Sequence, residues 1–249
     1  MKKLIALLVA LMMLGTAAAA VAETVTVAFN PEYPPFEYVN DNGEYEGYDV
    51  DLINAVAEKA GIEIAFEAMD FDAVISAVAT NPNTIGVSGI SITDERKLSV
   101  DFSEGYINAG LIVVVKKDSG YATTEDLKGK VIGVQQGTTS DFAAEDITGM
   151  ENVAQYKTFL NAIMELQGNK VDAVIVDKPV GMAILASLAD EELEIVDMGL
   201  QADWYGIEVN KANPELLEKI NAALKELEAE GFYEELAVKY FSSEEEAAE

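Results

Sequence analysis

The chain contains neither cysteine nor histidine among its 249 residues. Without cysteine it can form no disulfide and no thiolate metal site. Without histidine it lacks the side chain that most often serves as general base, zinc ligand or partner of a nucleophilic serine or cysteine. Catalysis would have to depend on carboxylates, lysine or tyrosine. These absences favour a binding role over an enzymatic one, and we expect no catalytic residue, no metal and no cofactor.

Basic residues are also scarce, with 16 lysines and arginines against 45 acids and a formal net charge of −29. Such a charge repels nucleic acid and anionic lipid headgroups, so we expect neither as a partner. Half of the residues are nevertheless apolar. That proportion is typical of a globular protein and excludes a disordered acidic chain.

The N-terminus carries the pattern of a secretory signal peptide. Lys2 and Lys3 are followed by an almost wholly apolar run over residues 4–14 and then by small residues up to Ala20-Val21-Ala22. This pattern predicts a signal peptide over residues 1–22. The run is short for a membrane span, although an uncleaved anchor is the alternative. We therefore expect a mature chain of 227 residues (249 minus 22) that is soluble in the periplasm or another extracytoplasmic space.

After the signal peptide, β-rich runs alternate with amphipathic segments. Predicted strands cover residues 24–28, 62–66, 85–87, 111–115, 131–134, 171–176 and 205–209. Predicted helices cover 48–60, a segment beginning at 70, 124–127, 160–167, 214–230 and a short final one ending at 241. This alternation predicts the α/β class, with parallel or mixed sheets and right-handed crossovers.

Eight short motifs follow one another along almost the whole mature chain. They are Tyr33-Pro34-Pro35-Phe36-Glu37, Gly47-Tyr48-Asp49-Val50-Asp51-Leu52, Met69-Asp70-Phe71, Gly89-Ile90-Ser91-Ile92-Thr93-Asp94-Glu95-Arg96, Asp101-Phe102-Ser103, Asp126-Leu127-Lys128-Gly129-Lys130, Gly137-Thr138-Thr139 and Asp172-Ala173-Val174. In this order the motifs resemble the polar amino-acid family of periplasmic solute-binding proteins, which includes the glutamine-, histidine- and arginine-type binding proteins of ABC transporters.

The resemblance implies a periplasmic binding protein-like fold, in which two mixed-sheet α/β lobes are joined by two hinge crossings. The crossings are expected near residues 106–110 and 201–205. Lobe 1 then comprises residues 23–106 and 205–249, including an acidic tail, and lobe 2 comprises 107–204. The resemblance also implies capture of a free L-amino acid by lobe closure and its delivery to an ABC permease. Because the sequence gives no sign of oligomerisation, we expect a monomer.

The chemistry of a free amino acid indicates which residues bind it. A carboxylate requires a cation with several donors, and Arg96 can provide two parallel hydrogen bonds. Ser91, Thr138 and Thr139 offer hydroxyls, and the turn that contains both threonines offers N–H groups where a helix begins. Asp177 follows a strongly apolar strand, at the kind of strand end that lines clefts, and could pair with the ammonium group.

Four further residues complete the expected surroundings of the ligand. Ser88 and Gly89 would add backbone acceptors, while Tyr33 and Phe71 would supply aromatic walls. For the ligand's own side chain, the neutral amides of Asn30 and Gln135 predict a neutral polar group such as that of glutamine. A charged side chain would lose its water there without gaining a counter-charge.

Each of these residues also has a plainer interpretation. Arg96 could be a solvated surface charge, Asp177 only a helix cap, residues 137–139 an ordinary turn, and Tyr33 and Phe71 core residues. At the level of function, two alternatives stay open. One is a dehydratase-type enzyme on the same fold with Asp177 as its acid, and the other is a sensory ligand-binding domain.

Overall fold

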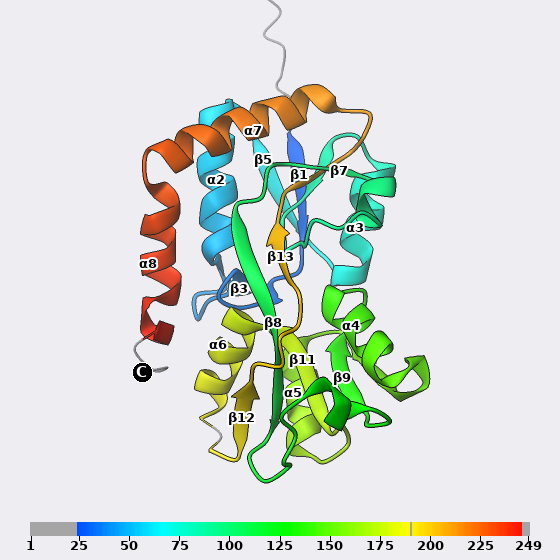
Figure 1. The fold of residues 1–249 in the computed structure, drawn as a ribbon. Coiled ribbons are helices and arrows are strands. Elements are labelled where there is room, and N and C mark those ends of the chain that lie inside the picture. Colours follow the sequence, from blue (N-terminus) through cyan, green and yellow to red (C-terminus); the bar gives the residue numbers. More distant parts are fainter. Residues whose placement is uncertain (1–23, 190, 246–249) are drawn as a thin grey trace, which may run out of the picture.

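The computed structural model describes residues 24–189 and 191–245, so the predicted signal peptide lies outside the described residues. Two lobes lie one above the other, each with its own sheet and helices (Figure 1). In the described part of the chain, no helix has the length and apolar character that a membrane span requires. The predicted α/β class with two mixed-sheet lobes is confirmed.

Lobe 1 is built on a five-stranded sheet in the order β5-β1-β6-β14-β7. Its strands are β1 (Val25–Phe29), β5 (Ile64–Ala68), β6 (Thr84–Gly86), β7 (Asp101–Phe102) and β14 (Glu208–Val209). Strands β5 and β6 run parallel to β1, whereas β14 is antiparallel to both β6 and β7. The helices of this lobe are α2 (Tyr48–Ala60), α3 (Phe71–Thr80), α7 (Pro214–Ala229) and α8 (Phe232–Glu245), and a small sheet contains β2 (Glu32–Tyr33), β3 (Glu37–Val39) and β4 (Tyr45–Glu46).

Helix α2 shows how the sequence sets the elements of this lobe. Acids occupy its first turn, where the positive helix end stabilises them, and Gly61 ends it in the left-handed conformation at φ 65°. The N–H of Ile62 then bonds the carbonyl of Ala57, which closes the helix end. Because this cap uses Ile62, the strand predicted to start there begins two residues later, at Ile64.

Lobe 2 is built on a sheet in the order β10-β9-β11-β8-β12. Its strands are β8 (Ile107–Lys116), β9 (Ile132–Gln135), β10 (Val153–Tyr156), β11 (Ala173–Asp177) and β12 (Leu193–Val196). The helices are α4 (Thr139–Thr148), α5 (Phe159–Gln167) and α6 (Lys178–Leu188), with short 3-10 helices at Thr124–Leu127 and Met150–Asn152. A third 3-10 helix, Arg96–Leu98, belongs to lobe 1.

Two antiparallel strands run between the lobes (Figure 1). One is the long strand β8, and the other is β13 (Ala202–Tyr205), whose register pairs Ala202 with Gly110 and Tyr205 with Ile107. Both overlap the segments predicted as hinge crossings. The lobe boundaries at 106/107 and 204/205 stay our proposal.

The C-terminal portion differs from the prediction in two ways. The single strand expected over 205–209 is divided into β13 and β14 at Gly206, where a Cβ atom would lie 2.8 Å from Ile92 Cδ1. The final helix, α8, is not short, since it extends through Glu245. It packs against α2, α7 and α6.

Candidate functional site

A cavity between the two lobes is lined by nine of the eleven predicted site residues. Lobe 1 contributes Tyr33, Phe71, Gly89, Ser91 and Arg96, and lobe 2 contributes Gln135, Thr138, Thr139 and Asp177. The remaining two, Asn30 and Ser88, are buried directly behind this lining and bond to one another through the Asn30 N–H and Ser88 Oγ at 3.0 Å. The fold thus brings together residues that lie up to 144 positions apart.

Arg96 is buried, with 6% of its surface exposed, so the interpretation as a solvated surface charge is wrong. Its Nη1 donates to the carbonyl of Ser91 at 2.9 Å and its Nη2 to the carbonyl of Gly137 at 3.0 Å. The guanidinium carbon lies 5.5 Å above the ring centre of Phe71. Burial lowers the pKa of Arg96, and the charges of Glu208 and Asp177 oppose this. Two of the five guanidinium N–H groups are used, which leaves three for a carboxylate.

Asp177 ends β11 and occupies the N-cap position of α6, but its side chain makes no cap hydrogen bond. The interpretation as a helix cap alone is therefore wrong. The carboxylate instead accepts a hydrogen bond from the Tyr33 hydroxyl, which lies 3.0 Å from the Tyr205 hydroxyl. Burial raises the pKa of Asp177 to about 6, against the hydrogen bonds from Tyr33 and Tyr205 and the charge of Arg96. A buried carboxylate at a cavity wall attracts a cationic group.

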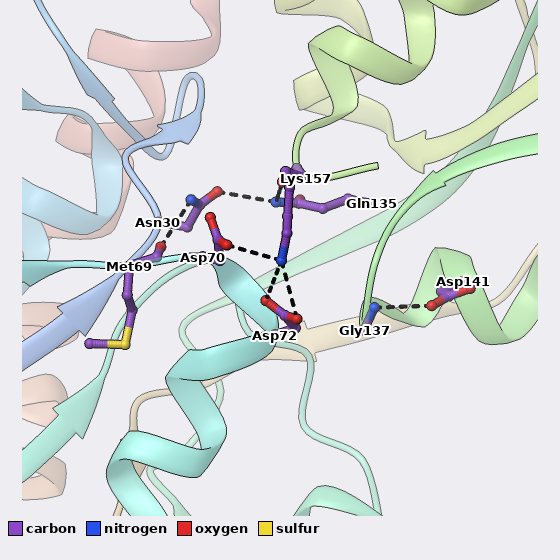
Figure 2. Close-up of polar contacts among 8 residues, drawn as sticks. All are labelled: Asn30, Met69, Asp70, Asp72, Gln135, Gly137, Asp141 and Lys157. Carbon is purple, nitrogen blue, oxygen red and sulfur yellow. Dashed lines mark hydrogen bonds and ion pairs between the residues drawn. The ribbon is translucent and has the colours of Figure 1, made fainter. Parts of the chain in front are cut away.

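The turn before α4 differs in one detail from the prediction. Thr138 Oγ1 donates to the carbonyl of Gln135 at 2.7 Å and accepts from the N–H of Asp141, so this hydroxyl serves the turn. Asp141 also accepts from the N–H of Gly137 at 3.0 Å (Figure 2). Thr139 Oγ1 lies 3.4 Å from Ser91 Oγ across the cleft. Of the two threonines, Thr139 is therefore the one whose hydroxyl faces the opposite lobe.

Asn30 and Gln135 form a direct amide bridge between the lobes. Gln135 Nε2 donates to Asn30 Oδ1 at 3.1 Å and to the carbonyl of Lys157 at 2.8 Å, while Asn30 Nδ2 donates to the carbonyl of Met69 (Figure 2). Both amides are almost completely buried. Together they form a neutral polar wall.

Two buried acids that the sequence analysis did not assign to the site support it from behind. Glu37 accepts a hydrogen bond from Ser88 Oγ at 2.7 Å, so the Ser88 hydroxyl points inward, away from the cavity. Asp49 accepts the N–H of Gly89 at 2.8 Å. Burial raises the pKa of Glu37 well above its usual value and that of Asp49 to about 6. Both acids belong to motifs already quoted. Their position among apolar residues was the feature of the sequence that could have predicted their burial.

Gly89 allows the ring of Tyr33 to approach the backbone closely. Its φ is +53°, a region that L side chains rarely adopt, and a Cβ atom there would lie 2.5 Å from Tyr33 Cε1. The volume left between the lining side chains is about 10 Å³, roughly what one water molecule requires. The described conformation therefore has no room for a molecule larger than water between these side chains.

Lys157 forms ion pairs across the rim of the cleft. Lys157 of lobe 2 lies with its Nζ 2.9 Å from Asp70 Oδ2 and 3.3 Å from Asp72 Oδ1, and both acids belong to lobe 1 (Figure 2). Among the described residues, these two are the only ion pairs between the lobes. Lys157 was not predicted, because nothing in its local sequence marks it. We call these three residues the rim triad.

Comparison with known proteins gives a family for the whole described chain. The model of the bacterial extracellular solute-binding proteins, family 3, matches residues 25–243. ABC transporter arginine-binding protein 1 of Escherichia coli is 33% identical over 244 residues, covering 97% of this chain and 99% of the relative.

Solved structures agree in fold over most of the chain. An ancestral arginine-binding protein bound to arginine is 39% identical with a TM-score of 0.82, covering 88% of this chain and 98% of the other. The structure of an ancestral arginine-binding protein bound to glutamine has 38% identity and the same TM-score, covering 88% and 97%. An ancestral amino-acid-binding protein described as a precursor of cyclohexadienyl dehydratase is 35% identical with a TM-score of 0.79, covering 88% and 96%.

Proposed function

The chain belongs to the family 3 bacterial extracellular solute-binding proteins, and from this premise we propose that it captures a free polar amino acid between its lobes for an ABC permease. One observation carries the proposal. Arg96 and Asp177, a buried cation and a buried anion on opposite lobes, line the same cavity. This pair matches the carboxylate and ammonium that every free amino acid carries on one carbon. We also propose that the mature protein acts as an extracytoplasmic monomer after removal of residues 1–22.

Binding and lobe closure are coupled through this pair. A ligand held by Arg96 of lobe 1 and by Asp177 and Thr139 of lobe 2 gains its full set of contacts only when the lobes are closed. A ligand shifts such an equilibrium only by the difference between its affinities for the two states. Contacts shared between two lobes supply that difference, which is the usual basis of hinge closure.

For the ligand's side chain, we propose a neutral polar group such as that of glutamine. Of the two bridged amides, Gln135 lines the cavity and Asn30 lies behind it, so this wall is polar but uncharged, and Tyr33 and Phe71 provide apolar faces. A charged group against this wall would lose hydration without a counter-charge.

Arginine is the second candidate, and the rim triad favours it together with the arginine-binding relative. Asp70 and Asp72 flank the cavity-lining Phe71 and are held by Lys157. The guanidinium of a long ligand could replace the Lys157 ammonium on these acids.

Competition calorimetry with glutamine, arginine and glutamate distinguishes the two candidates. We expect glutamine to bind at least as tightly as either charged amino acid. Arginine binding more than about tenfold tighter than every neutral amino acid, a difference of about 1.4 kcal/mol, would contradict the neutral assignment. Loss of that advantage in an Asp70→Asn, Asp72→Asn double variant would then assign the guanidinium to the rim acids.

Replacing Lys157 with methionine is expected to accelerate dissociation of the bound amino acid about two- to fivefold, because an exposed ion pair stabilises the closed state only modestly. High salt should reduce the difference between the dissociation rates of the variant and the wild type, because it screens the ion pair in the wild type. Stopped-flow displacement measures the rate. Lys170→Met is the matched control, since Lys170 pairs with Glu165 within lobe 2 at 2.7 Å. Equal dissociation rates in Lys157→Met and the wild type would show that Lys157 does not stabilise the closed state.

The enzymatic alternative has less support from the site. A dehydratase-type acid must be free to donate a proton. The raised pKa of Asp177, about 6, is compatible with such a role, but its carboxylate accepts a hydrogen bond from Tyr33, which favours the ionised form. An ammonium partner would favour its ionised form further. Turnover of prephenate or arogenate by the purified protein would reverse this preference.

A further inference from the structure

Glu208 is an acid that the proposed binding mechanism does not use. Its side chain is completely buried, and within the described part of the chain neither carboxylate oxygen has a hydrogen-bond partner. Burying a carboxylate without partners is costly, and such a group in a native structure calls for a physical explanation.

The position of Glu208 in the sheet places its carboxylate on the face that α3 covers. Strand β14 lies between β6 and β7, and Glu208 stands opposite Gly86 and Phe102. A Cβ atom on Gly86 would lie 2.7 Å from Glu208 Oε2 and 3.1 Å from Val74 Cγ1. The carboxylate therefore shares the α3 face of the sheet with Val74, and the absence of a side chain at residue 86 leaves room for it.

Residues on the same face of the sheet connect Glu208 with Arg96 through packing contacts. Val74 packs in one apolar cluster with Phe71, and the Arg96 guanidinium lies over the Phe71 ring. Of the charges that act on Arg96, that of Glu208 comes first and that of Asp177 second. Glu208 thus acts on the carboxylate-binding end of the cavity.

The charge of Glu208 changes near neutral pH. Burial raises its pKa to about 7, opposed by the positive charge of Arg96. Strand β6 carries no ionisable side chain. The charged groups on the other elements around Glu208 are partly or fully exposed to solvent, unlike Arg96. They are Asp101 on β7, Asp72 on α3, Lys97 next to Arg96, and Glu215, Glu218, Lys219, Lys225, Glu226 and Glu228 on α7.

We propose that Glu208 makes the affinity of the amino-acid site dependent on pH, because its ionised form competes with the ligand carboxylate for the field of Arg96 and its protonated form does not. This inference rests on the proposed function. A bound carboxylate next to Arg96 repels an ionised Glu208, so binding favours the protonated form and takes up a proton. Affinity therefore rises as pH falls through about 7.

Asp177 contributes in the opposite direction. It must be ionised to hold the ammonium, so affinity falls again once pH drops below its pKa of about 6. The two acids together give an affinity maximum, whose alkaline limb belongs to Glu208 and whose acid limb belongs to Asp177. Removing Glu208 should flatten the alkaline limb and leave the acid limb unchanged.

The test is titration calorimetry of glutamine, with arginine in parallel, on the wild type, Glu208→Gln and Glu208→Leu. The second variant replaces the carboxylate with an apolar group of similar size, in case an amide is poorly accommodated. We expect the wild type to bind about three- to tenfold tighter near pH 6.5 than near pH 8.5, since a tenfold ratio corresponds to about one unit of ligand-linked pKa shift. At both pH values, Glu208→Gln and Glu208→Leu should bind with the affinity that the wild type has near pH 6.5.

Buffers of different ionisation enthalpy count the protons taken up, and uptake is expected only when Glu208 is present. Asp203→Asn is the control, because this half-exposed acid also acts on Arg96 but more weakly than Glu208. Equal wild-type affinity at the two pH values, or an unchanged pH dependence in both Glu208 variants, would overturn the role of Glu208 while leaving amino-acid binding in place. Absence of binding by any of the twenty amino acids at every pH would instead overturn the proposed function, and with it this role.

Discussion

Replacing Arg96 with alanine is expected to weaken amino-acid binding by about 2–5 kcal/mol, the usual cost of truncating one member of a buried, hydrogen-bonded charge pair. The ligand carboxylate would lose its only buried cationic partner among the residues that line the cavity. The substitution also removes the Nη2 bond to the Gly137 carbonyl, which joins the lobes. Arg96→Lys should recover only part of the loss, because an ammonium cannot form two parallel hydrogen bonds.

Calorimetry with the amino acid that binds most tightly measures the effect. Lys97→Ala is the matched control, since Lys97 is the neighbouring cation but is exposed and pairs with Asp94 at 3.7 Å. Its affinity should equal that of the wild type. Wild-type affinity in Arg96→Ala would show that the carboxylate binds elsewhere.

Asp177→Asn is expected to weaken binding by a comparable amount, about 2–5 kcal/mol, because it removes the buried charge that faces the ligand ammonium. It should also change the pH dependence. The wild type has an Asp177 pKa of about 6, and an ammonium partner lowers that pKa in the complex. Binding therefore releases a proton near this pH, and wild-type affinity falls as pH drops below about 6.

Titration calorimetry from about pH 5 to pH 7 tests this prediction against Asp146→Asn as control, since Asp146 is an exposed acid on α4. The control should keep the acid limb, whereas Asp177→Asn should lose it. Normal affinity together with a normal acid limb in Asp177→Asn would show that the Asp177 carboxylate does not hold the ligand ammonium. Asp177 would then serve only as the first residue before α6.

The sequence was sufficient for the lobes and for the residues that line the cavity. Arg96, Gly89 and Thr139 were identified because they lie in the ordered motifs that resemble a known family. Asp177 was marked by a local pattern, since it follows an apolar strand. Such patterns identify which residues end strands or begin helices, and strand ends in α/β sheets gather at one edge.

The contacts that depend on how the two lobes are placed could not be predicted in this way. Lys157 meets Asp70 and Asp72 only because the end of β10 in lobe 2 approaches the start of α3 in lobe 1. The burial of Glu208 depends similarly on the room left by Gly86 on another strand. These pairings join residues more than 80 positions apart and leave no periodic signal in the sequence.

The most direct test of the central claim, that the cleft binds a free amino acid, is a thermal-shift screen of the mature protein against the twenty amino acids. At about a hundredfold excess over Kd, a bound ligand adds about 2.7 kcal/mol to the free energy of unfolding, which raises Tm by about 5–10 °C for a chain of this size. We predict such a rise for at least one polar amino acid in the wild type and, at the same ligand concentration, no more than about a third of it in Arg96→Ala. No rise with any of the twenty amino acids in the wild type would contradict the assignment of the cleft as an amino-acid site.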